Sequence, residues 1–191
     1  ATISRVGILG GSVSGYKYTG GLVGWSATST ITASYATGSV SAFADVGGLV
    51  GLNDKLSEIT ASYASGDVTS SYNRAGGLVG VNSASTITAS YATGDVSSAV
   101  GSAGGLVGNN EDASTITSSY ATGNVSGGYA GGLVGLNAST IISSYAVGVA
   151  TGDDTYVGGL VGFYGSGTLT NNWWFNETNV AGVGSGDVGE V

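Results

Sequence analysis

Threonines in a Thr-x-Thr pattern are the residues of this chain whose type and spacing most regularly suggest chemistry. The pairs are Thr30 and Thr32, Thr86 and Thr88, Thr115 and Thr117, and Thr168 and Thr170. In a β-strand, residues i and i+2 point to the same side, so each pair would place two hydroxyls and two methyls on one face. A regular Thr ladder could order water and bind ice, although Thr is also an ordinary solvent-facing strand residue. These eight threonines form the candidate binding face.

The pairs recur because the whole chain is a repeat. The pentapeptide Gly-Gly-Leu-Val-Gly occurs six times at intervals of 27 to 29 residues, starting at Gly20, Gly47, Gly76, Gly104, Gly131 and Gly158. A second landmark, Ser-Tyr-Ala, begins at Ser34, Ser62, Ser90, Ser119 and Ser144. The segments Glu58-Ile59-Thr60 and Thr140-Ile141-Ile142 interrupt the Thr pairs. Function must therefore be sought in rows of equivalent residues.

The hydrophobic period within each unit is two, which indicates strands. In residues 31–35, Ile31, Ala33 and Tyr35 are expected on one face and Thr32 and Ser34 on the other. No apolar helical stripe is present, and frequent Gly would penalise a helix. Length changes fall between the landmarks, where loops absorb them. The paired glycines before each Leu suit a tight corner or a positive φ.

These features predict an all-β fold, a β-solenoid (β-helix) of about six coils of 27–29 residues with divergent end caps. Coils are expected about 4.8 Å apart, with like residues above like. Residues 1–19 are expected to form a divergent N-terminal half-coil or cap, residues 20–162 the repeats, and residues 163–191 an aromatic C-terminal cap and Gly-rich tail. Trp173, Trp174 and Phe175 would plug the last core layer. The interior columns are Leu22, Leu49, Leu78, Leu106, Leu133 and Leu160, and Ile31, Ile59, Ile87, Ile116, Ile141 and Leu169.

Two further rows have a structural and a functional interpretation. The Asn row is expected to form a stacked ladder inside a turn, in preference to a binding site. The Tyr row is expected to stack on the inner face with its hydroxyls at a rim, whereas an exposed aromatic track would suggest glycan binding. The rows are Asn53, Asn82, Asn110 and Asn137, and Tyr35, Tyr63, Tyr91, Tyr120 and Tyr145.

The sequence offers little material for catalysis or metal binding. There is no His and no Cys, so an imidazole base, a thiolate and the usual zinc ligands are missing. Asp67 and Asp95 follow equivalent turn glycines, which indicates turn chemistry, and the pairs Glu111-Asp112 and Asp153-Asp154 lie in variable loops. We expect no enzyme activity, no cofactor and no metal site. Three N-glycosylation sequons begin at Asn124, Asn137 and Asn176.

Composition narrows the class of partner. The 191 residues carry a formal net charge of −8 with only four basic residues, which argues against nucleic acid and anionic lipid. No apolar run is long enough to insert into a membrane. The absence of Met, even at position 1, indicates a processed chain or a fragment. Low charge with abundant Ser, Thr, Gly and Asn suits an extracellular or cell-surface protein.

The repeats resemble the GLUG-motif repeats of bacterial and archaeal surface proteins. The shared pattern is Gly-Gly-Leu-Val-Gly-x-Asn followed by Ser-x-Ile-x-x-Ser-Tyr-Ala-x-Gly-x-Val, seen in residues 76–82 and 85–96. The segment from Trp173 to Thr178 is similar to the aromatic segment that closes such arrays. This resemblance covers residues 20–178 and implies large secreted, adhesin-like proteins in which the repeat is a stalk or display surface. It brings no catalytic residues and names no ligand.

The function expected from the sequence is a structural or display repeat domain of an extracellular surface protein, an adhesin-like stalk. One alternative is a self-assembling surface filament or sheath subunit, which would bind copies of itself. Another is an ice-binding protein that uses the Thr ladder. The expected partners are therefore the chain itself or a host or environmental surface.

Overall fold

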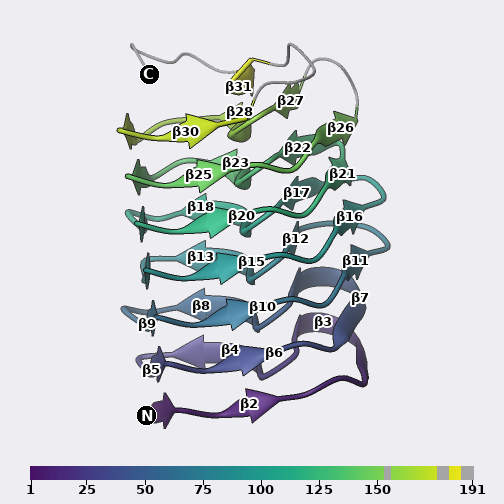
Figure 1. The fold of residues 1–191 in the computed structure, drawn as a ribbon, viewed down its shortest axis with the longest axis vertical. Coiled ribbons are helices and arrows are strands. Elements are labelled where there is room, and N and C mark those ends of the chain that lie inside the picture. Colours follow the sequence, from purple (N-terminus) through teal and green to yellow (C-terminus); the bar gives the residue numbers. More distant parts are fainter. Residues whose placement is uncertain (153–155, 176–180, 186–191) are drawn as a thin grey trace.

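A computed structural model describes residues 1–152, 156–175 and 181–185. In this part of the chain every regular element is a β-strand, apart from a single residue in 3₁₀ conformation at Tyr156. The strands wind into a stack of coils, with the N-terminus at one end and the last coils at the other (Figure 1). The prediction of a β-solenoid with about six coils is confirmed.

Each coil passes through four parallel sheets in the order A, B, C and D, and then starts again one level higher. Sheet A holds the Thr-x-Thr segments, and sheet B holds the Tyr-Ala segments and faces the viewer in Figure 1. The strands of sheet A are β1 (Thr2–Ser4), β5 (Thr30–Thr32), β9 (Glu58–Thr60), β14 (Thr86–Thr88), β19 (Thr115–Thr117), β24 (Thr140–Ile142) and β29 (Thr168–Thr170). Those of sheet B are β2 (Gly7–Ile8), β6 (Tyr35–Ala36), β10 (Tyr63–Ala64), β15 (Tyr91–Ala92), β20 (Tyr120–Ala121), β25 (Tyr145–Ala146) and β30 (Trp173–Trp174).

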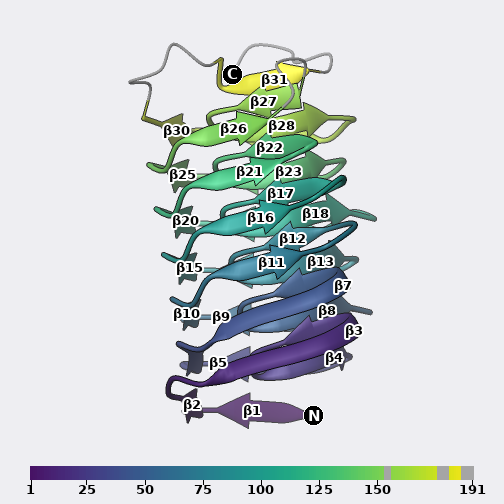
Figure 2. The ribbon, with the colours of Figure 1, turned by 90° about the vertical axis from the view of Figure 1, so that its right-hand side faces the viewer.

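Sheet C precedes the Gly-Gly-Leu corner and sheet D follows it. In the first two coils one long strand crosses sheet C, whereas later coils use two short strands separated by an excursion (Figure 2). Its strands are β3 (Ser12–Gly20), β7 (Ser39–Gly47), β11 (Val68–Ser70), β12 (Ala75–Gly76), β16 (Val96–Ser98), β17 (Ser102–Gly104), β21 (Val125–Gly127), β22 (Tyr129–Gly131), β26 (Ala150–Gly152) and β27 (Val157–Gly158). Sheet D contains β4 (Val23–Ala27), β8 (Val50–Asp54), β13 (Val79–Ser83), β18 (Val107–Glu111), β23 (Val134–Asn137), β28 (Val161–Tyr164) and β31 (Val183–Ser185).

Strand register places equivalent residues of successive coils directly above one another. Ile87 pairs with Ile59 below and Ile116 above, for example, so the Ile column is continuous. The central Leu and Ile residues of both predicted columns are fully buried, and Leu22 and Leu169 at the ends are partly buried. Both columns belong to one hydrophobic cluster, which confirms the predicted interior. A second buried cluster of Val and Ala lines sheet C.

The predicted facing of residues 31–35 is wrong, because the chain turns at the corner between sheets A and B. One residue of every coil has a left-handed backbone there, with φ between 49° and 56°: Arg5, Ala33, Ala61, Ala89, Ser118, Ser143 and Asn171. This turn breaks the alternation of faces that a continuous strand would keep. Ala33 is therefore exposed, Ser34 points inward, and Tyr35 lies on the outer side with Ala36 behind it.

Close backbone approach explains the paired glycines of the repeat. A Cβ on Gly77 would overlap the carbonyl oxygen of Gly105 in the next coil and lie 2.8 Å from the Ala92 methyl. Gly77 and the other glycines of the pairs have no positive φ. Of the two explanations offered by the sequence, the tight corner is correct and the positive φ is not.

The two ends of the stack differ from the expected caps. Residues 1–19 contribute strands to sheets A, B and C in register with the next coil, which is more than a half-coil. At the other end Trp174 packs against the core and lies beside Gly159 and Gly182, so it covers the last layer as expected. Trp173 and Phe175 are exposed, so the expected three-residue plug is a single residue. Residues 176–180 and 186–191 of the expected tail lie outside the described part.

Candidate functional site

The outer side of sheet A gathers all eight predicted binding-face residues into two columns, which we call the threonine face. Strand register also brings in residues that the search for Thr pairs left out, because Thr2, Thr60 and Thr140 each supply one Thr to a column. Glu58 and Ile142 are the interruptions, and both side chains point outward with the threonines. The columns are Thr2, Thr30, Glu58, Thr86, Thr115, Thr140 and Thr168, and Ser4, Thr32, Thr60, Thr88, Thr117, Ile142 and Thr170.

The threonine face can present a regular array of hydroxyls and methyls to solvent. Its threonines are exposed or half-buried. Neighbours in a column are about 4.8 Å apart, and the two columns are about 6.6 Å apart along the strands. Among the described residues, no hydrogen bond involves the hydroxyls of these threonines, because the serine side chains that reach the threonines bond only their backbone carbonyls. Such an array can order water or contact a periodic surface.

The tyrosines of sheet B form a continuous ladder on the outer side of the solenoid. Adjacent rings of Tyr35, Tyr63, Tyr91, Tyr120 and Tyr145 stack with centroids 4.8–4.9 Å apart and planes within 6° of parallel. The predicted stacking is confirmed, but the predicted inner face is wrong because of the left-handed corner. Each ring covers the face of its neighbour, so the ladder presents ring edges and hydroxyls. A sugar would find few free ring faces there, which weakens the glycan interpretation of this row.

Two tyrosines of the ladder, Tyr63 and Tyr120, have a raised pKa. Burial raises the pKa of the Tyr63 hydroxyl, and the nearby Tyr91 and Tyr35 raise it further. Burial likewise raises the pKa of Tyr120, with smaller contributions from Tyr91 and Tyr145. Ionisation of one phenol would place a negative charge beside the next ring.

The asparagine row is the internal ladder that the sequence predicts. The Nδ2 atom of each Asn donates to the Oδ1 atom of the next at 2.8–2.9 Å, from Asn53 through Asn82 and Asn110 to Asn137. All four side chains are fully buried. The sequon at Asn137 is therefore closed to a glycosyltransferase in the folded chain. Asn124 is exposed, and Asn176 lies outside the described residues.

Serine ladders are the repeated feature that sequence reasoning missed. The buried Ser90 hydroxyl accepts the backbone N–H of Ser62 in the coil below at 3.2 Å and donates to the Thr88 carbonyl at 2.8 Å. The Ser of every Ser-Tyr-Ala landmark repeats this pattern, and a second ladder runs through Ser57, Ser85, Ser114 and Ser139. The sequence did hold a sign of this ladder: every Ser-Tyr-Ala landmark keeps its Ser, although simple alternation would place that residue in solvent, where its identity need not be kept.

Acidic residues form local contacts, and the described part of the chain contains no group of three or more metal-ligating side chains. Asp45 is buried, with the Arg74 Nε atom at 2.8 Å and the Lys17 Nζ atom at 3.8 Å from its carboxylate. Arg74 also lies 3.9 Å from Glu111. Asp153 and Asp154 lie outside the described residues. No helix that could cross a membrane occurs among the described residues.

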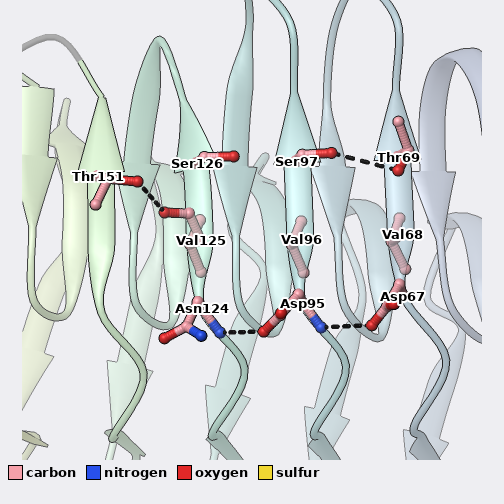
Figure 3. Close-up of a pocket in the computed structure, with 10 residues that line it drawn as sticks. All are labelled: Asp67, Val68, Thr69, Asp95, Val96, Ser97, Asn124, Val125, Ser126 and Thr151. Atoms are coloured by element: carbon pink, nitrogen blue, oxygen red, sulfur yellow. Dashed lines mark hydrogen bonds between the residues drawn. The ribbon is translucent and has the colours of Figure 1, made fainter.

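Asp67 and Asp95 form a ladder on the outer side of sheet C. The Oδ1 atom of Asp67 accepts the backbone N–H of Asp95 at 3.0 Å, and Asp95 accepts that of Asn124 at 2.8 Å (Figure 3). Asn124 in turn accepts the N–H of Val149. The expected turn chemistry is thus extended from one coil to the next.

Comparison with known proteins identifies the repeat. A family model described as "The GLUG motif" matches residues 15–41, 44–69, 71–97 and 99–126, which is more than half of the chain. The strand register continues beyond these matches through β29 and β30. A search of curated proteins and a search of solved structures found no match.

Proposed function

Because the chain belongs to the GLUG-motif family, we propose that it serves as a structural and display module of an extracellular cell-surface protein, as part of an adhesin-like stalk. The observation that supports this most strongly is the continuity of the stack. Every coil contacts the next through a hydrophobic column, an Asn or Ser ladder and the backbone pairs of four sheets. Such a structure can be lengthened by adding coils without changing its cross-section.

The ladders also support a rod that resists bending. The core residues are branched aliphatics and Ala in fixed columns, and the buried amides and hydroxyls bind neighbours above and below. Bending between two coils would have to break several of these contacts together. The outer faces carry mainly Thr, Ser, Tyr and Gly with few charges, which suits exposure to varied surroundings.

Adding coils tests the rod. Two extra copies of residues 77–104, inserted after residue 104, should lengthen the particle by about 10 Å in solution scattering, which is twice the interstrand distance. Its cross-section and its β-type circular dichroism should not change, and its unfolding temperature should not fall. A particle that grows in width would contradict a rod built coil by coil.

Labelling of intact cells tests the location. An antibody raised against the purified chain should bind the source cells before permeabilisation, and a control antibody against a cytosolic enzyme should bind only afterwards. Labelling of the chain that needs permeabilisation would overturn the surface role while leaving the rod intact.

Ice binding is a second candidate, and the two-column threonine face favours it. Thr at eleven of fourteen outward positions, in register over seven strands, gives a periodic array of methyls and hydroxyls. The double variant Thr88→Tyr, Thr117→Tyr would disturb the centre of this array. If the proposal is correct, the parent chain shows thermal hysteresis, and the variant loses most of it.

The matched control for ice binding is Ser126→Tyr, which adds the same ring to an exposed strand residue of sheet C. It should keep the thermal hysteresis of the parent. Absence of hysteresis in the parent, or an equal loss in the control, would dismiss the threonine face as an ice-binding surface.

A further inference from the structure

Two hollows on the outer side of sheet C lie end to end along the solenoid and share one lining residue, and we call the pair the trough. One has a volume of about 310 Å³ and is lined by residues of β11, β16, β21 and β26 with the adjoining Asp67, Asp95 and Asn124. The other, about 370 Å³, is lined by residues of β3, β7 and β11 and by Ser71. Thr69 lines both. The trough therefore runs across six coils, parallel to the axis of the stack.

From this trough we infer a binding site for an extended, uncharged polysaccharide chain, which adds a ligand to the rod described above and does not depend on where the rod is located. The floor of the trough carries one hydroxyl in each coil. These residues pair in register: Ser14, Ser41, Thr69, Ser97, Ser126 and Thr151. Ser97 already donates to the Thr69 hydroxyl at 3.3 Å and Thr151 to the Val125 carbonyl at 3.1 Å, so these two offer acceptor oxygens, whereas the other hydroxyls can still donate. The row repeats about every 4.8 Å, so a polymer of hydroxyl-bearing units can meet one hydroxyl in every coil.

One edge of the trough supplies fixed acceptors. The Asp67 and Asp95 carboxylates are held in place because each Oδ1 atom accepts a backbone N–H from the next coil (Figure 3). Each Oδ2 atom lies outside this ladder, on an exposed residue. A carboxylate oxygen that is already oriented can accept hydrogen bonds from sugar hydroxyls without the entropy cost of ordering a free side chain.

The other edge supplies apolar contact near the first coils. Tyr16, Phe43 and Tyr72 stack with centroids 5.0–5.1 Å apart and are 39–72% exposed, and Phe43 lines the trough. The stack places aromatic edges beside the hydroxyl row. Tyr72 is the last ring of this stack among the described aromatic pairs and is half exposed, so its edge can add apolar contact for a sugar.

The residues that line the trough favour one class of ligand over the others. No Lys or Arg is among the residues that line the two hollows, and two carboxylates are, which disfavours nucleic acid and anionic polysaccharides. The floor presents one hydroxyl in each coil, and the apolar side of an amphipathic helix would leave these hydroxyls without a partner. The backbone of these strands is paired within sheet C, so an added peptide strand has no free edge on this face. Uncharged polysaccharide fits all three observations.

Affinity electrophoresis tests the inference with soluble linear polymers of β-linked glucose, xylose and mannose and with an anionic polyuronate. We expect at least one neutral polymer to retard the chain and the polyuronate to have no effect. The double variant Asp67→Ala, Asp95→Ala should raise the dissociation constant about tenfold, since it removes hydrogen bonds to charged acceptors. The matched control Glu58→Ala, Thr88→Ala removes a carboxylate and a hydroxyl from the threonine face and should bind as the parent does.

A second variant guards against a folding defect. Thr69→Tyr would fill the point where the two hollows meet and should also abolish retardation, while circular dichroism and the unfolding temperature stay close to the parent's. The inference is overturned if no neutral polymer retards the parent, if the polyuronate binds more tightly than they do, or if both trough variants bind normally. It is equally overturned if the control loses binding to the same extent. None of these outcomes would bear on the length of the rod or on its cellular location.

Discussion

A chain that carries Gly104→Ala is expected to lose about 3 kcal/mol or more of its free energy of unfolding. The added Cβ would overlap the carbonyl oxygen of Val107 and lie 2.6 Å from the amide nitrogen of Gly135 in the next coil. Both atoms belong to backbone, so no side-chain rotation can make room. Relief would require the Gly-Gly-Leu corner to move away from its neighbour, which would weaken the buried column at Leu106. Denaturant unfolding followed by circular dichroism measures the loss.

Gly165→Ala is the matched control for this prediction. A Cβ there would find its nearest neighbour, the Asn137 carbonyl oxygen, at 3.6 Å, which is ordinary contact, and Gly165 has no positive φ. The control should unfold within about 0.5 kcal/mol of the parent. If both variants were equally stable, close approach of the backbones would not be the reason for the paired glycines.

The sequence was sufficient to predict those structural features that depend only on which residues recur in each repeat. Leu49, Leu78 and Leu106 recur at the coil period, and a solenoid places equal positions one above another, so the interior columns followed directly. The Asn ladder followed in the same way, because an amide carries both a donor and an acceptor and can bind a copy of itself. These predictions needed the period but not the path of the chain within a coil.

The path within a coil could not be predicted, because a left-handed residue changes which side chains face inward. Ala33 costs about 1–2 kcal/mol in that conformation, and no propensity rule would place it there. Its backbone N–H donates to Thr60, and the next residue, Ser34, enters the buried serine ladder. The strain is therefore offset by contacts with another coil, which are not visible in a single repeat.

The trough on sheet C escaped prediction for a related reason. Its lining uses different letters in successive coils, such as Ser41, Thr69 and Ser97, so it does not stand out as a conserved string in the repeat. It also depends on where sheet C divides: β7 crosses the sheet as one strand, whereas β11 and β12 are separated by an excursion. The threonine face, with its repeated letters, was the easier surface to find.

The second large effect is expected for Asn110→Leu, which should cost about 2–3 kcal/mol of the free energy of unfolding. Leu fills a similar volume, but it cannot accept from the Asn82 amide at 2.9 Å or donate to the Asn137 Oδ1 atom at 2.8 Å. Asn82 keeps its bond to the Ser85 carbonyl, whereas the Asn137 oxygen stays buried without this donor. In contrast, Asn124→Leu replaces an exposed Asn of sheet C and should cost less than about 1 kcal/mol.

At the start of the same Asn ladder, one substitution is expected to raise the free energy of unfolding instead of lowering it. Asn53 lies in register with Ser26, and its buried Oδ1 atom has no hydrogen-bond partner among the described residues. Ser26→Asn would place an amide donor where the ladder now ends, and we expect it to raise the free energy of unfolding by about 1 kcal/mol. Denaturant unfolding of the Asn110→Leu and Ser26→Asn variants, measured beside the parent, tests both expected changes in stability. If Asn110→Leu were harmless and Ser26→Asn brought no gain, the amide ladder would be a consequence of stacking and not one of its causes.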